Sequence, residues 1–364
     1  MQRAILLIMT ALLGLFLAGC GKSDSDGAMF RGDLQRRGAG SGSGPAKLSG
    51  SAWIFPSGYS ITGSAVVSRE LVLFGSMDRF FYGVSLQEGK EVWRFDSSAS
   101  ISGSPAVAGE TIFFGNRAGL LFALDLKGKE RWRFTAGGEI RSSPLVADGL
   151  VCFSAMDGKL YALDSKTGTL RWSVDAGSPM ESSPSLEQGT LFVGTSKGKL
   201  LAFALKNGQA RWSFSVGRDI SATPAVADGV VYVGSRDRSF YAVDAQSGQL
   251  KWSFRAGNEI VSSAAVAGGR VFFGCDDSKF YALDAVAGKL LWLVPTSGMI
   301  DSSPTVAGGT VYFGSRDGFV YGIDATKGEK LWKFRADSWV RASPVVVGNL
   351  LLVGSDSGKM IALK

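Results

Sequence analysis

The sequence predicts an all-β protein, an eight-bladed β-propeller of four-stranded antiparallel blades. Three observations point to this fold class. Tryptophan recurs at intervals of 40 residues, with a single interval of 39. Each interval holds four short apolar runs separated by Gly, Asp, Asn or Ser, and no run has the 3.6-residue period of a helix. A period near 40 with four strands is typical of propeller blades. The repeated tryptophans are Trp53, Trp93, Trp132, Trp172, Trp212, Trp252, Trp292 and Trp332.

One unit, residues 140–172, shows the expected strands most clearly. Its apolar runs are Ser143–Ala147, Leu150–Ser154, Lys159–Asp164 and Thr169–Val174. The last three alternate apolar and polar residues, as half-buried strands do. One such sheet cannot bury both faces alone, so the units must pack on one another in a ring. Proline in the first run, as in Ser143-Pro144, fits an innermost edge strand, where no further strand needs its missing N–H.

The count of runs predicts how the ring closes. First strands begin near Ile61, Ile101, Ile140, Met180, Ile220, Ile260, Ile300 and Val340, which gives eight blades. The chain ends with Met360–Lys364, which matches a third strand, so the last blade lacks a fourth. Ala52–Phe55 is a fourth strand with no first three before it. We therefore expect Ala52–Phe55 to complete the C-terminal blade, which removes both open sheet edges.

The first fifty residues differ in composition from the repeats. Residues 1–19 carry one positive charge and an apolar run too short to span a bilayer, which is typical of a signal peptide. The ending Leu17-Ala18-Gly19-Cys20 resembles a bacterial lipobox, and that resemblance implies lipid attachment at Cys20. An ordinary signal peptide with a chance cysteine is the alternative. Residues 20–50 are rich in Gly, Ser and charge and predict a flexible tether, in which Met29-Phe30 docks on the propeller. Residues 51–364 form the propeller.

Charge and cysteine content exclude several functions. The net charge of +7 comes from Lys and Arg residues spread through turns. Nucleic-acid binding needs a concentrated basic footprint, so we expect none. Apart from Cys20, the cysteines are Cys152 and Cys275, in blades too far apart for a disulfide. We expect both to be buried free thiols in a monomeric propeller.

The segment that closes each unit carries a family resemblance. Residues 162–172 fit the pattern A-x-D-x-x-T-G-x-x-x-W, and near copies follow at 242–252, 282–292 and 322–332. The pattern resembles the tryptophan-docking motif of PQQ-like repeats in quinoprotein-type propellers. In physical terms, Asp and Thr order the turn by hydrogen bonds to the backbone. The repeated tryptophans then have a structural role: each lies between blades, and its N–H needs a partner.

The resemblance raises the question of catalysis, which the residues argue against. A resemblance to quinoprotein dehydrogenases implies a PQQ cofactor clamped by a vicinal-cysteine disulfide, with a calcium ion and a catalytic Asp. This sequence has no adjacent cysteine pair and no histidine, the commonest general base. Asp276-Asp277 stands in a turn, where solvation is expected. We therefore predict no enzyme activity, no catalytic or metal-binding residues and no cofactor.

The channel mouth offers the best candidate contact site. The residues that follow the apolar ring of first-strand positions include Arg141, Glu181, Asp301 and Arg341. Arg141 and Glu181 can pair across the ring with Asp301 and Arg341 respectively, or neighbours can pair along the rim. Either way, such ion pairs are worth little each. The functional interpretation is a polar mouth that grips a partner loop or small ligand. Trp339, beside Arg341, is the best single contact candidate.

A lipobox, a tether and eight PQQ-like blades together resemble the BamB family of lipoproteins. The resemblance implies a non-catalytic, periplasmic interaction scaffold that assists assembly of outer-membrane β-barrel proteins, with the β-barrel assembly machine and unfolded barrel precursors as partners. Gly21, rather than Asp, after Cys20 favours the outer membrane, with the inner membrane and cell surface as alternatives. Two other functions stay open: a degenerate quinoprotein that binds PQQ or another small ligand, and a scaffold of an unrelated envelope complex.

Overall fold

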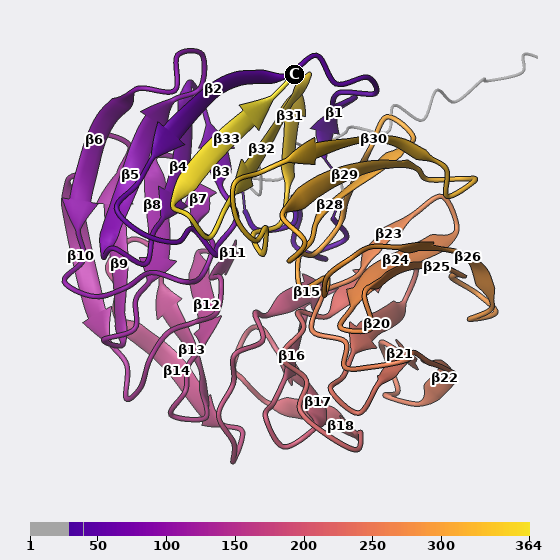
Figure 1. Ribbon diagram of the computed structural model, residues 1–364. Coiled ribbons are helices and arrows are strands. Elements are labelled where there is room, and N and C mark those ends of the chain that lie inside the picture. Colours follow the sequence, from indigo (N-terminus) through magenta and orange to yellow (C-terminus); the bar gives the residue numbers. More distant parts are fainter. Residues whose placement is uncertain (1–28, 39) are drawn as a thin grey trace, which may run out of the picture.

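The protein is an eight-bladed propeller in the computed structural model, which describes residues 29–38 and 40–364 (Figure 1). Its secondary structure within that part of the chain consists of strands and turns, without helices. The blades surround a central channel, with neighbouring blades packed face to face. The predicted fold class is confirmed.

Blade 3 illustrates the unit. It consists of β11 (Leu145–Ala147), β12 (Leu150–Ser154), β13 (Lys159–Asp164) and β14 (Leu170–Asp175), each antiparallel to the next. The innermost strand starts later than the sequence suggests, because Pro144 just before it has no N–H to pair. The other three strands match the expected runs to within one residue.

The remaining blades repeat this order. Blade 1 is β3 (Val66–Ser68), β4 (Leu71–Gly75), β5 (Phe80–Ser85) and β6 (Glu91–Asp96), and blade 2 is β7 (Ala106–Ala108), β8 (Thr111–Gly115), β9 (Leu120–Asp125) and β10 (Glu130–Thr135). Blade 4 is β15 (Ser185–Glu187), β16 (Thr190–Gly194), β17 (Lys199–Ala204) and β18 (Ala210–Ser215), and blade 5 is β19 (Ala225–Ala227), β20 (Val230–Gly234), β21 (Ser239–Asp244) and β22 (Leu250–Arg255). Blade 6 is β23 (Ala265–Ala267), β24 (Arg270–Cys275), β25 (Lys279–Asp284) and β26 (Leu290–Pro295), and blade 7 is β27 (Thr305–Ala307), β28 (Thr310–Gly314), β29 (Phe319–Asp324) and β30 (Lys330–Arg335).

The ring closes in blade 8 through strands from both ends of the chain. β31 (Val345–Gly348), β32 (Leu350–Gly354) and β33 (Lys359–Leu363) are completed by β2 (Ser51–Pro56), which pairs with β33 so that Trp53 faces Ala362 (Figure 1). The predicted closure is therefore confirmed. A short strand, β1 (Ser41–Gly42), is added on the channel side, parallel to β31.

The core lies between blades, and a tryptophan joins each interface. The Trp172 indole of blade 3 donates its N–H to the carbonyl of Leu205 in blade 4 at 3.0 Å. Gly208 lies against the face of the same indole, where an added Cβ would come within 2.7 Å of the ring. Five of the other seven repeated tryptophans donate to a carbonyl of the next blade in the same way, and Trp332 donates to the carbonyl of Pro45 in the N-terminal segment. Trp292 Nε1 is buried without a partner among the described residues.

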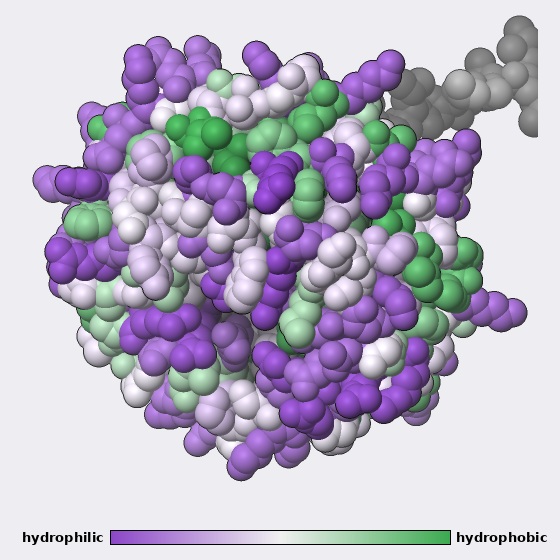
Figure 2. Space-filling model, viewed as in Figure 1, coloured by the Kyte–Doolittle hydropathy of each residue, from purple (hydrophilic) through white to green (hydrophobic). Residues whose placement is uncertain are grey.

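The outer edges of the blades are mostly polar. Figure 2 shows hydrophilic residues over much of the face in view and small hydrophobic patches near its edge. One patch lies where Figure 1 places β26, whose Leu290, Leu291 and Leu293 side chains are exposed.

A ring of hydroxyl groups holds the innermost ends of the blades together around the channel. In seven of the eight blades, the hydroxyl of the residue just before the proline position accepts the backbone N–H of the same position in the preceding blade, at 2.8–3.3 Å. The chain of bonds runs Ser64, Ser104, Ser143, Ser183, Thr223, Ser263, Ser303, Ser343. It therefore has seven links among eight blades and is interrupted between Ser343 and Ser64.

Residues 29–38 and 40–44 run through the channel, which differs from the expected flexible tether. Met29 forms an antiparallel bridge with Ala106 of β7, in agreement with its predicted docking. The carbonyls that follow accept backbone N–H bonds at 2.8–2.9 Å from the inner strands of four successive blades: Leu34 from Leu186, Gln35 from Val226, Arg37 from Val266 and Gly38 from Val306. The inner strands have free edges, so an extended segment in the channel satisfies them and becomes ordered. Residues 1–28, with the predicted signal peptide and the predicted lipid-attachment residue Cys20, lie outside the described residues.

Candidate functional site

The predicted rim lies on one face of the ring, which we call the rim face. It is built from the connectors that lead into each inner strand and from the turns between second and third strands. Backbone bonds tie the two sets together, such as Arg236 N–H to the Asp219 carbonyl at 2.9 Å. The turns between first and second strands and between third and fourth strands form the opposite face, as the bond from Ser165 N–H to the Gly149 carbonyl shows. The buried apolar ring below the rim, which includes Ile140 and Met180, fixes the connectors.

Arg141 and Glu181 pair as neighbours along the rim. The Arg141 guanidinium lies 3.7 Å from the Glu181 carboxylate and 2.8 Å from that of Glu139. The hydrogen bond to Glu139 raises the pKa of Arg141. Of the two arrangements that the sequence left open, the structure has the neighbour pairing here.

Asp301 and Arg341 have different partners from those considered. Asp301 binds Arg316 at 2.6 Å, and Arg341 binds Asp356 at 2.8 Å. Both partners come from turns between second and third strands, fifteen residues further along the chain. Neither the cross-ring nor the neighbour pairing of Asp301 and Arg341 occurs among the described residues.

Trp339 stands at the rim with half of its surface exposed. Its relative exposure is 50%, and the Arg316 guanidinium lies over its ring, 5.3 Å from the centroid. Because Asp301 also binds Arg316, the indole lies on a charged pair. An exposed aromatic ring held in one orientation loses little entropy when it binds a partner.

A charged network that the sequence did not reveal lies on blades 5 and 6. Arg236 bridges Asp219 at 3.1 Å and Glu259 at 2.9 Å, and Glu259 also binds Arg218 at 2.7 Å. Burial raises the pKa of Asp219. Arg236 and Arg316 occupy the same position of the turn after the second strand. An arginine that recurs at this repeat position is the sequence signal that could have revealed the network.

Asp276 occupies this turn position in blade 6 and is partly buried, contrary to the expected solvation. Burial and, next, the charge of Asp301 raise the pKa of Asp276 to about 6. Its Oδ1 atom, like Oδ1 of Asp301, is buried without a hydrogen-bond partner among the described residues. Two neighbouring carboxylates thus share a poorly hydrated part of the rim.

Asp277, by contrast, is structural. Its carboxylate accepts the Tyr281 hydroxyl at 2.5 Å and backbone N–H groups from Gly257 and Lys279. The same Asp–Tyr bond recurs in four other blades, between residues 78 and 82, 157 and 161, 237 and 241, and 317 and 321. This repetition identifies a turn-ordering device.

The channel holds two arginines that sequence reasoning did not single out. Arg36 is 0% exposed and donates to the carbonyls of Pro184 at 3.2 Å, of Pro144 at 2.8 Å, and of Phe30. Arg31 donates to the carbonyls of Arg36 and Ala264. Burial lowers the pKa of each guanidinium to about 9, so both stay protonated at neutral pH. Their acceptors are main-chain carbonyls, which leave no signature in the sequence.

The structure also bears on metals, thiols and membrane spans. Within residues 29–38 and 40–364, no group of three or more His, Cys, Asp or Glu side chains is placed to hold a metal ion. Cys152 and Cys275 are buried and free, and burial raises the pKa of both thiols. No helix in this same part of the chain is long and apolar enough to cross a membrane.

Several solved propeller structures resemble this protein in fold. The most similar solved structures include BamB from Moraxella catarrhalis, with 19% identity, a TM-score of 0.77, and coverage of 87% of this chain and 100% of that one. Quinohemoprotein alcohol dehydrogenase from Comamonas testosteroni has 15% identity, a TM-score of 0.80, and coverage of 92% and 80%. A europium-containing methanol dehydrogenase has 16% identity, a TM-score of 0.77, and coverage of 91% and 89%. At these identities, the likeness shows a shared propeller fold.

The sequence comparisons are more specific. No curated protein sequence matches the chain. Four overlapping stretches, residues 82–221, 180–266, 207–298 and 255–364, match one family, whose description is outer membrane protein assembly factor BamB. These stretches cover most of the propeller, and the chain belongs to this family of PQQ-like repeat propellers.

Proposed function

We propose that this protein is a non-catalytic, lipid-anchored interaction scaffold on the periplasmic face of the outer membrane, where it assists the assembly of β-barrel proteins. The observation that carries the proposal is the rim face, where Trp339 stands half exposed on the Arg316–Asp301 pair. Aromatic and arginine side chains held together at an exposed position are typical of interface anchors. The match to the BamB family supports this choice of biological setting.

The channel supports a role without PQQ. Residues 31–38 cross the channel, and the cavity beside them has a volume of about 240 Å³, below the usual range of roughly 300–1,000 Å³ for drug-sized ligand sites. The chain has no adjacent cysteine pair and no histidine. The residues present therefore do not fit a PQQ site, and catalysis on that cofactor is not part of the proposal.

The scaffold role is tested by crosslinking in cells. A photoreactive residue replaces Trp339, and crosslinked membrane extracts are analysed by mass spectrometry. We expect adducts with a component of the barrel-assembly machine. The matched control carries the same residue at Val286, which is 87% exposed in a turn of the opposite face. Adducts with other envelope proteins alone, or equal yields from both positions, contradict the proposal.

The lipid anchor is tested separately. Cys20→Ala removes the proposed site of lipid attachment and leaves the propeller intact. We expect the variant to leave the outer-membrane fraction and not to incorporate labelled fatty acid. Unchanged labelling would place the lipid elsewhere, and equal membrane association without label would show that the protein itself binds the membrane.

A further inference from the structure

The interruption in the hydroxyl ring marks a second site, independent of the rim face. Seven ring hydroxyls accept a backbone N–H from the preceding blade, but no such bond reaches Ser64 from Ser343. The Ser64 side chain is only 3% exposed, and its hydroxyl oxygen has no hydrogen-bond partner among the described residues. A buried hydroxyl without a partner loses its hydrogen bonds to water and gains none in return, so this position favours a ligand that satisfies it.

Arg31 brings a second unsatisfied group to the same place. Its guanidinium is buried, with 7% of the residue exposed. Nε and Nη2 donate to the carbonyls of Arg36 and Ala264, whereas Nη1 is buried without an acceptor in the described part of the chain. No carboxylate there forms an ion pair with Arg31, because the nearby Asp33 binds Arg37 at 2.8 Å instead. Among the residues that the structure describes, this protonated guanidinium in the channel thus has no carboxylate as a counter-ion.

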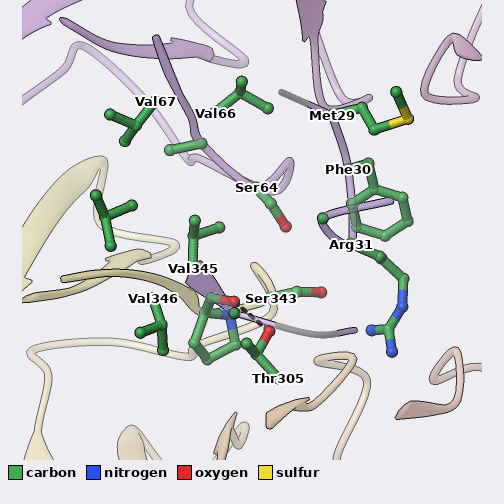
Figure 3. A pocket seen from close by; sticks show the side chains of 15 residues that line it. Met29, Phe30, Arg31, Ser64, Val66, Val67, Thr305, Ser343, Val345 and Val346 are labelled. Carbon is green, nitrogen blue, oxygen red and sulfur yellow. Dashed lines mark hydrogen bonds between the residues drawn. The ribbon is translucent and has the colours of Figure 1, made fainter. Parts of the chain in front are cut away.

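Both groups line one pocket. Figure 3 shows Ser64 and Arg31 around a cavity whose volume is about 240 Å³. Much of the remaining wall is apolar and comes from the inner strands of blades 1 and 8: Val66 and Val67 of β3, and Val345 and Val347 of β31. Ser343, the last hydroxyl of the ring, also lines the cavity.

We propose that this pocket binds a small carboxylate with a short apolar tail. Arg31 Nη1 and the Ser64 hydroxyl are the unused donors among the described lining residues, and a carboxylate is an acceptor for groups of both kinds. The valine walls take the tail and exclude long polar ligands. Phosphate or sulfate fits less well, because those anions need more donors than one guanidinium N–H and one hydroxyl supply. The proposal concerns the channel and does not depend on the scaffold function.

The test is calorimetric titration of the full-length protein, purified in a nonionic detergent, with sodium butyrate. The matched ligand is butyramide, which has the same tail and no charge. We expect saturable binding of butyrate and at least tenfold weaker binding of butyramide. Equal binding of the two ligands would overturn the proposal, as would displacement of butyrate by an equal concentration of chloride.

Three variants locate the site. Arg31→Met removes the guanidinium, Ser64→Ala removes the hydroxyl, and Val67→Phe fills the cavity while both donors remain. We expect at least tenfold loss of butyrate affinity for Arg31→Met and Val67→Phe, and several-fold loss for Ser64→Ala. The control is Arg37→Met, which removes an exposed arginine of the same segment that binds Asp33. Near-ultraviolet circular dichroism checks that each variant is folded. Unchanged affinity in Ser64→Ala and Val67→Phe, or an equal loss in Arg37→Met, would overturn the proposal.

Discussion

Ser154 and Met180 are a matched pair of exceptions in the repeat. Ser154 ends the second strand of blade 3 at the position where each other blade has glycine: residues 75, 115, 194, 234, 274, 314 and 354. Met180 belongs to the apolar ring, in which each other member is Ile or Val. The glycine of one blade packs on the apolar ring residue of the next: a Cβ on Gly115 would lie 2.2 Å from Ile140 Cγ2. A β-branched residue therefore needs glycine beside it, whereas unbranched methionine leaves room for serine.

This relationship predicts coupling between the two positions. Met180→Ile alone should lower the free energy of unfolding by about 1–3 kcal/mol, because the branched side chain meets Ser154. The same change in a Ser154→Gly background should cost less than about 1 kcal/mol. Urea denaturation of both single variants and the double variant measures the coupling. Equal costs of Met180→Ile in the two backgrounds would contradict the steric explanation.

Arg36 should contribute strongly to stability. Arg36→Met leaves the carbonyls of Pro144 and Pro184 without their donor, and each unsatisfied carbonyl costs about 1–3 kcal/mol. We expect a lower unfolding free energy in urea titrations. Arg37→Met is the control, since it removes only an exposed pair worth at most about 1 kcal/mol. If the two variants are equally stable, the buried guanidinium does not hold the segment in the channel.

Two tryptophans separate the hydrogen bond from the packing of the indole. Trp172 donates to the Leu205 carbonyl, whereas Trp292 Nε1 has no partner in the described residues. Phenylalanine preserves much of the ring contact and removes the N–H. Trp172→Phe should therefore destabilise the protein by about 1 kcal/mol more than Trp292→Phe, as measured by urea denaturation. A larger loss of unfolding free energy for Trp292→Phe would show that packing of the indole, and not its hydrogen bond, determines the contribution of each tryptophan to stability.

The rim should make stability depend on pH. The pKa of Asp276 is about 6 in the folded protein, above the value of 3.8 for a free side chain. Between these values the folded state binds more protons than the unfolded state, so this residue's contribution to the unfolding free energy falls as pH rises toward neutrality. Asp276→Asn should therefore raise stability at pH 7 more than at pH 5 in urea titrations. Glu110→Gln, at an exposed pair, is the control. A greater gain at pH 5 would contradict this assignment.

The sequence allowed the ring to be predicted because every blade repeats the same signals. Trp53 and Met360–Lys364 even indicated that the strand around Trp53 pairs with the last strand of the C-terminal blade. The course of residues 29–38 and 40–44 could not be predicted, because carbonyls such as those of Leu34 and Gln35 make its contacts, and any residue type supplies a carbonyl. The burial of Arg36 is also the opposite of what an arginine in a Gly-rich segment suggests.

The candidate rim was predicted in position but only partly in pairing, because Arg141 and Glu181 pair as neighbours whereas Asp301 and Arg341 bind other residues. The residue after each apolar ring position does reach the rim, as Arg141 shows. The partners of Asp301 and Arg341 are residues of turns, and the direction of a turn side chain depends on packing between blades. In the sequence, Ser64 is only one member of a repeated position, the residue just before the proline position of each first strand. Its exceptional state comes from the missing link to Ser343, which depends on how the ring closes.

The completion of blade 8 by β2 has a consequence for how the protein is made. β2 lies near the start of the chain and its partner β33 near the end, and the channel segment needs inner strands from blades 4 to 8. During synthesis, therefore, β2 has no partner strand until β33 has been made, and the channel segment has no complete set of inner strands to bind. Such distant contacts form late, because the intervening chain must be ordered first. Ring closure is accordingly a final step that a truncated chain cannot take, and a ribosome that stalls before β33 releases a protein with an open edge.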